Sequence, residues 1–76
     1  SLAAHLPRDA DNNAIRGKAV LHDAKNNLIV SDKRHIALCG VENLVVVETA
    51  DTVLVCHKDR AQEIKQLLPR IPEKLL

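Results

Sequence analysis

Histidine and cysteine are the side chains of this sequence with the widest chemical range. Four histidines and two cysteines include His35 and Cys39, four residues apart, and the adjacent Cys56 and His57. Imidazole and thiolate bind zinc, so a site made from His22, His35, Cys39 and Cys56 is one hypothesis. Structural zinc sites, however, usually contain close pairs such as C-x₂-C, and the sequence has none. We therefore predict no metal ligands.

Nucleophilic catalysis by Cys39 or Cys56, with a histidine as base, is a second hypothesis. A reactive thiolate needs an electropositive, partly exposed setting, whereas both cysteines stand in apolar runs. The carboxylates stand singly, mostly in polar connecting segments where Asp and Glu stabilise turns. Gly17 and Gly40 are the only glycines, so no Gly-rich loop is available to bind phosphate. We predict no catalytic residue, no cofactor-binding residue and no cofactor on this chain.

The composition argues against several classes of protein. The 76 residues include no Phe, Tyr or Trp, and 11 Lys and Arg against 10 Asp and Glu give a net charge of +1. Without a basic stripe or aromatic side chains for base stacking, we expect no nucleic-acid partner. The longest apolar runs are four residues, far short of the roughly 20 that span a bilayer, so we expect no membrane partner. Because the cysteines are too few for a disulfide framework and no secretory signal is recognisable, we expect a cytoplasmic protein.

The middle of the chain has the pattern of a mainly β domain. Short runs rich in Val, Ile and Leu alternate with polar connecting segments, which is typical of strands separated by turns. We predict five strands, at residues 18–22, 28–31, 35–39, 44–48 and 52–57.

Two ways of pairing these strands fit the pattern. Strand starts eight to ten residues apart suit an antiparallel meander, which the pattern alone slightly favours. The alternative is a β-solenoid, in which alternate strands stack in parallel register. Val20, Ala37 and Leu54 are 17 residues apart, as are Ile29 and Val46, and such a fixed return distance is what stacked coils produce.

The beginning of the chain is expected to be a linker. Residues 1–9 lack a clear period, and we interpret them as a linker or arm. Residues 11–13, Asp-Asn-Asn, form a turn, because Asn and Asp tolerate left-handed backbone angles. A weak echo relates residues 10–15 to residues 24–29, at a distance of 14. We expect the β-coil to cover residues 10–57.

Residues 58–69 are predicted to form an α-helix. Asp59 is assigned as its N-cap, and Gln62 stands three residues later in the capping-box position. An apolar stripe at helical spacing follows, and Pro69 ends the helix. The stripe consists of Ala61, Ile64, Leu67 and Leu68. Residues 70–76 are expected to be a tail.

The last two predicted strands are apolar at nearly every position. A strand of this kind is either buried on both faces or bound to a partner on one of them. We therefore name four valines as a candidate interface: Val45, Val47, Val53 and Val55.

Two longer stretches resemble a known family. Residues 40–55, GVENLVVVETADTVLV, and residues 58–65, KDRAQEIK, together with His22-Asp23, Asn26 and Ser31, resemble the C-terminal region of mannose-1-phosphate guanylyltransferases. The resemblance runs from about residue 13 to residue 68, and the DRAQEIK element is its most specific part.

This resemblance implies a fold and a parent activity. It implies a short left-handed β-helix, ending in a helix and packed against a catalytic domain or a second subunit. It also implies a parent enzyme that forms GDP-mannose and pyrophosphate from GTP and mannose 1-phosphate with Mg²⁺. The family's catalytic signature, G-x-G-x-R-L-x-P-L-S, has no counterpart here, so no catalytic residue is carried over. His35, Cys39 and Cys56 replace residues that are more usual in the family.

The sequence therefore predicts a non-catalytic C-terminal domain of such a nucleotidyltransferase. Its expected partners are its own catalytic domain and further copies of itself, and its expected role is domain packing and oligomerisation. One rival hypothesis is a free-standing homodimeric interaction module. A weaker rival is a small metal- or thiol-dependent enzyme built on the cysteines and histidines.

Overall fold

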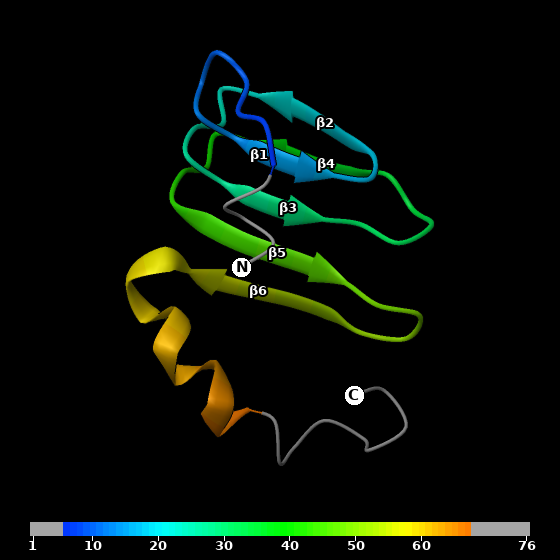
Figure 1. Ribbon diagram of the computed structural model, residues 1–76, viewed down its shortest axis with the longest axis vertical. Helices are drawn as coiled ribbons and strands as arrows, with labels where there is room; N and C mark the ends of the chain where they lie inside the picture. The colour runs from blue at the N-terminus through cyan, green and yellow to red at the C-terminus, as the bar shows by residue number, and fades with distance from the viewer. Residues whose placement is uncertain (1–5, 68–76) are drawn as a thin grey trace.

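The computed structural model describes residues 6–67 as a mainly β structure with six strands and one helix (Figure 1). The elements are β1 (Ala14–Arg16), β2 (Ala19–His22), β3 (Leu28–Val30), β4 (Ile36–Cys39), β5 (Leu44–Glu48), β6 (Val53–His57) and the helix η1 (Lys58–Gln66). The five predicted strands are present, with bounds that differ by one residue at most. Strand β1 was not predicted, because three residues next to Gly17 are too short a run to show a period.

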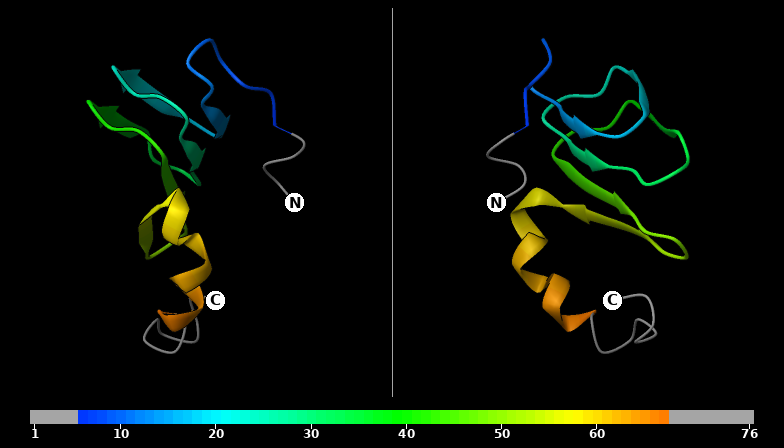
Figure 2. Two further views of the ribbon diagram at one scale, coloured as in Figure 1. Left: turned by 90° about the vertical axis from the view of Figure 1, so that its left-hand side faces the viewer. Right: turned by 45° about the vertical axis from the view of Figure 1, so that its right-hand side comes forward.

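The chain winds between two sheets. One sheet has the order β1-β3-β5-β6, and the other contains β2 and β4. Strands β1, β3 and β5 are parallel to one another, and so are β2 and β4. Figure 1 shows β2 and β4 as a second layer behind β1 and β3, and the turned views of Figure 2 separate the layers. This parallel stacking matches the coil alternative, and the predicted meander is wrong for β1 to β5.

The 17-residue spacing in the sequence is the length of one turn of this coil. It places Val20 opposite Ala37 and Ile29 opposite Val46, as predicted. The pairing of β1 with β3 has a shorter return of 14 residues, seen where Ala14 lies opposite Leu28. The 14-residue echo in the sequence is therefore the signature of a shortened first turn.

The third member of the predicted stack, Leu54, does not continue the coil. It lies opposite Val47, because β6 runs antiparallel to β5. A tight turn reverses the chain here, with the Thr49 amide donating to the Thr52 carbonyl at 2.8 Å. The chain thus returns along the same sheet instead of crossing to β4.

The corners of the coil require unusual backbone angles. Six residues have a positive φ, namely Asn12, Gly17, Asp23, Asn26, Gly40 and Asn43. Asn and Asp enter this left-handed region more readily than other residues with a side chain. At Gly17, where φ is 105°, a Cβ atom would lie 2.7 Å from the Ser31 carbonyl oxygen, so only glycine fits.

The core between the two sheets is thin. The buried apolar residues among those described are Ala14, Ala24, Ile29 and Val46. The buried polar residues are Asn13, Asn27, Ser31 and Glu48. As expected from the composition, small and branched aliphatic side chains fill the interior, and polar side chains bonded to the backbone complete it.

The helix differs from its prediction in type and in cap. It is a 3₁₀-helix whose N-cap is His57, so the assignment of Asp59 as N-cap is wrong. His57 has extended backbone angles, and its Nδ1 accepts from the Asp59 amide at 3.1 Å. Asp59 instead lies in the first turn, where a carboxylate favours the helix dipole. Among residues 6–67, no side-chain hydrogen bond links Gln62 to the helix start.

The 3₁₀ geometry agrees with the spacing of the helix residues. Side chains three residues apart eclipse one another in such a helix. Ala61, Ile64 and Leu67 therefore lie on one line, and so do Arg60 and Glu63. The predicted helix end at residues 68–69 and the tail 70–76 lie outside the described residues.

Candidate functional site

The last strand of the larger sheet, β6, has one face that the coil does not cover. Val46 on β5 and Val55 on β6 lie directly opposite each other, so their side chains share a face. Yet Val46 is 3% exposed and Val55 is 59% exposed. The second sheet has two strands and the first has four, so the layer that buries Val46 does not continue over β6 (Figure 2).

The four valines predicted as an interface lie on two different faces. Because side chains alternate along a strand, Val53 and Val55 share the inward face of Val46. Val45 and Val47 point the other way and are half-buried. The outward face carries two apolar rows in register: Leu28, Val45 and Cys56, then Val30, Val47 and Leu54. The chain therefore offers two separate apolar surfaces.

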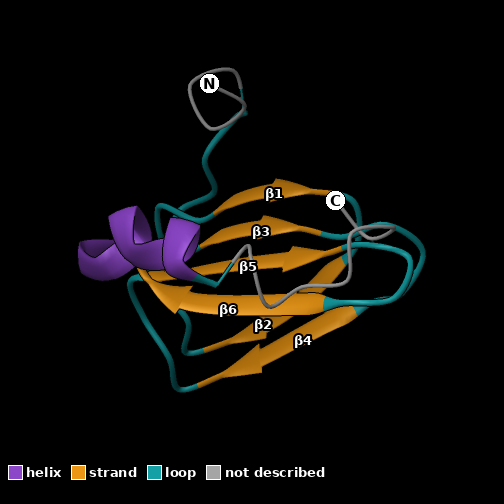
Figure 3. Cartoon of the chain, turned by 90° about the horizontal axis from the view of Figure 1, so that it is seen from below, coloured by secondary structure: helices purple, strands orange, loops and turns teal. Residues whose placement is uncertain are grey.

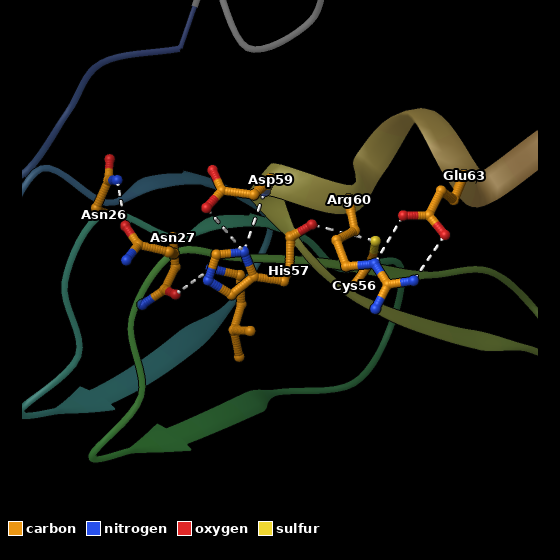
Figure 4. Close-up of polar contacts among 9 residues, drawn as sticks. Asn26, Asn27, Cys56, His57, Asp59, Arg60 and Glu63 are labelled. Carbon is orange, nitrogen blue, oxygen red and sulfur yellow. Dashed lines mark hydrogen bonds and ion pairs between the residues drawn. The ribbon is translucent and has the colours of Figure 1, made fainter.

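A groove of about 430 Å³ runs between β6 and the helix. Within it, the guanidinium of Arg60 donates two hydrogen bonds to Glu63, at 2.6 and 2.8 Å (Figure 4). These bonds lower the pKa of the Glu63 carboxyl below its ordinary value. The groove thus holds a neutralised charge pair among mostly apolar atoms. It is lined by Val55, Cys56, His57, Arg60, Glu63, Ile64, Gln66 and Leu67.

The backbone of β6 faces this open side with unused hydrogen-bonding groups. The amide of Lys58 donates to Asn43 and that of Thr49 to Thr52, which fixes the alternation of bonded pairs along the hairpin. By this alternation the amides and carbonyls of Val53, Val55 and His57 point away from β5. Viewed from below, β6 is the rim of the sheet and η1 stands beside its Lys58 end (Figure 3).

An asparagine ladder holds the corner nearest the helix. Asn12 donates to Asn26 at 2.8 Å, and Asn26 donates to Asn43 at 2.6 Å, each from the side-chain amide to the side-chain oxygen. The Lys58 ammonium adds a bond to Asn26 at 3.1 Å, and its burial lowers the pKa of this group. The ladder thus links three successive turns to the start of η1.

A second, buried ladder lies inside the same corner. Asn27 donates to Asn13 at 3.0 Å and accepts from the Leu44 amide at 2.9 Å. Asn13 in turn bonds to Asp9, whose pKa is lowered by the Asn13 amide. Sequence reasoning missed both ladders, although the 14-residue echo of Asn-Asn pairs was their signal. Asp9, predicted to lie in the linker, takes part in the first corner.

The buried carboxylate Glu48 holds the opposite end of the coil. It accepts hydrogen bonds from the amides of Asp32 at 2.8 Å and Arg34 at 3.2 Å. The Arg34 guanidinium adds an ion pair at 3.3 Å. The amide bond from Asp32, foremost, lowers the pKa of Glu48. Glu48 thus fixes the turn between β3 and β4.

The side chains considered for zinc or thiol chemistry do not form one cluster. His22 and Cys39 are neighbours across β2 and β4, on the outward face of the smaller sheet. Cys56 lies on the other sheet, and His35 is exposed in the segment before β4. Within residues 6–67, no group of three or more His, Cys, Asp or Glu is arranged to hold a metal. In the same residues, no helix has the length and apolarity to cross a membrane.

The stacked coil and its paired corners define a β-helix domain, and comparison with known proteins gives the family. Residues 17–71 match the model of the MannoseP isomerase/GMP-like beta-helix domain. The chain therefore belongs to this family.

Relatives with 36–45% identity are enzymes of sugar-nucleotide and polysaccharide biosynthesis by name. Mannose-1-phosphate guanylyltransferase of Escherichia coli is 43% identical over 79% of this chain. The xanthan biosynthesis protein XanB of Xanthomonas campestris is 45% identical over 84%, and the alginate biosynthesis protein AlgA of Pseudomonas aeruginosa 36% identical over 80%. The chain spans only 13–14% of the length of these relatives.

A solved structure shares the fold as well as the sequence. It is titled as a mannose-1-phosphate geranyltransferase from Thermus thermophilus and superposes with a TM-score of 0.75 at 32% identity. The match covers 83% of this chain and 19% of that one. Sequence and structure comparisons thus agree on a β-helix domain found within much longer proteins.

Proposed function

We propose that this chain is the non-catalytic C-terminal β-helix domain of a nucleotidyltransferase that makes GDP-mannose and pyrophosphate from GTP and mannose 1-phosphate. The observation that carries the proposal is the family match over residues 17–71, with relatives that carry this enzyme's name. In the proposed parent, Mg²⁺ assists the reaction at a separate catalytic domain, and the protein is cytoplasmic.

The polar side chains support a scaffolding role for this domain. The Asn13 and Asn27 pair and Glu48 direct their hydrogen bonds to the backbone of neighbouring turns. These groups therefore hold the coil together and do not converge on a substrate. The proposed coil is left-handed, and η1 covers its open end together with a neighbouring domain.

The outward face of the larger sheet is the surface that we assign to the catalytic domain. Val45 and Val47 lie there, half-buried, beside Leu54 and Cys56 in adjacent register. None of these four side chains is charged, which suits the apolar centre of a permanent interface.

The experiment is an assay of the full-length parent protein and of the 76-residue chain alone. The parent is expected to release pyrophosphate from GTP only when mannose 1-phosphate and Mg²⁺ are present, and the chain alone to release none. A parent that turns over neither substrate would overturn the proposal. Turnover by the chain alone would overturn its non-catalytic part.

A further inference from the structure

We propose that β6 is an edge along which two copies of this chain pair, antiparallel and related by a two-fold axis at Val55. This proposal deepens the assembly role proposed above and rests on it. It starts from the outward-pointing backbone groups of Val53, Val55 and His57, which have no strand partner among the described residues.

The register of such a pair is self-complementary. With Val55 opposite Val55 of the second copy, Val53 lies opposite the second copy's His57, and the reverse holds by symmetry. Every residue in these pairs is one whose amide and carbonyl already point outward. Each donor therefore meets an acceptor without any change in the pairing of β5 with β6.

Strand β6 also lacks the features that protect exposed edges. Soluble proteins usually place Lys, Pro or a bulge on a free edge strand. Residues 53–57, VLVCH, contain no Lys, Arg, Asp, Glu or Pro. The other edge of the same sheet, β1, is different, since it carries Arg16 and is bridged by Arg8.

The side chains favour a second copy as the occupant. Val53 and Val55 are 56% and 59% exposed, and pairing joins them to the same valines of the second copy in one apolar strip. No charge on β6 opposes a like charge in this register, so nothing in the strand repels its copy. Arg60 and Glu63 at the rim neutralise each other and need no charged partner.

The test is sedimentation equilibrium of the whole chain over a wide range of concentration. The expected mass rises from 8.4 kDa towards twice that value as concentration rises. Val55→Lys is expected to abolish the rise, whereas Val20→Lys, on the outward face of the smaller sheet at 60% exposure, is a matched control that leaves it intact.

Val55→Pro keeps the proposal falsifiable if the charged variant unfolds. The Val55 amide points away from β5, so proline removes only the outward donor, and circular dichroism checks that the fold is kept. A wild-type chain that stays monomeric throughout would overturn the proposal, and so would undiminished association of a folded Val55 variant. If Val55→Lys instead blocks binding of the rest of the parent chain, that segment is the occupant and the second copy is excluded. None of these results depends on GDP-mannose formation, so the two proposals fail separately.

Discussion

The side-chain amide of Asn27 donates to Oδ1 of Asn13, 3.0 Å away, and joins the first two turns of the coil inside a buried corner. The same Oδ1 accepts from the Asn27 backbone amide at 2.9 Å. Because each Asn satisfies backbone groups of the next turn, the corner transmits its geometry along the coil.

Replacement of Asn27 by alanine is expected to destabilise the domain strongly. The Leu44 amide and the Asn13 side chain would each lose a partner, at about 1–3 kcal/mol for every buried group left unsatisfied. Urea denaturation measures the loss. Asn12→Ala in the exposed ladder is the control, and it should cost clearly less because water can replace the lost bond. Equal losses in the two variants would contradict the role of the buried corner.

Replacement of Gly17 by alanine tests the corner between β1 and β2. The positive φ and the contact with the Ser31 carbonyl both oppose a Cβ atom, so a loss of about 1–3 kcal/mol in the free energy of unfolding is expected. Gly40→Ala is the matched control: its φ is also positive, but a Cβ there meets nothing within 4 Å, so it should cost about 1 kcal/mol. A smaller loss for Gly17→Ala than for Gly40→Ala would refute this assignment.

The Glu48 carboxylate predicts a particular loss of stability in acid. Its pKa in the folded state lies below the ordinary value of 4.5, since the charged form accepts the amides of Asp32 and Arg34. A lowered folded pKa stabilises the protein above the unfolded value, and the stabilisation is lost as pH falls through 4.5 towards the folded pKa. Asp9 and Glu63 contribute in the same direction.

The measurement compares wild type with Glu48→Gln by urea denaturation across this range of pH. The variant should be less stable at neutral pH, and the difference should shrink as the pH falls below 4.5. A difference that stays constant with pH would show that the Glu48 charge is not the stabilising group.

Much of the fold could be predicted from the residues. Runs such as 44–48 and 53–57 are β-branched and bounded by turn residues, and the recurrence of Ile29 and Val46 at 17 residues marks one turn of the coil. The short strand β1 and the hairpin at Leu54 could not be predicted in this way. The first lacks length, and the second depends on a turn that keeps the same spacing as a crossover would.

The helix cap and the faces of the interface valines depended on tertiary geometry. His57 is a less usual cap than Asp59, and it becomes the cap because β6 ends in extended conformation with Nδ1 aimed at the first turn. Val45 and Val55 look alike in the sequence, but the register of the hairpin places them on opposite faces.

The packing face can be tested by one substitution. Val47→Lys places a charge on the outward face of the larger sheet and is expected to weaken binding to the separately expressed catalytic domain at least tenfold, which corresponds to about 1.4 kcal/mol. Titration calorimetry measures the affinity. Val20→Lys, on the smaller sheet, should leave binding unchanged, and a Val47→Lys chain that binds as wild type does would exclude this face.

The central claim is that this domain works by packing and not by chemistry, and reconstitution in trans tests it most directly. A parent protein shortened to lack this domain is assayed for GDP-mannose formation with and without the 76-residue chain added. The account predicts that the shortened enzyme is unstable or weakly active, and that the added chain binds to it and restores both stability and turnover. A shortened enzyme that is fully stable and active, and that does not bind the chain, would contradict it.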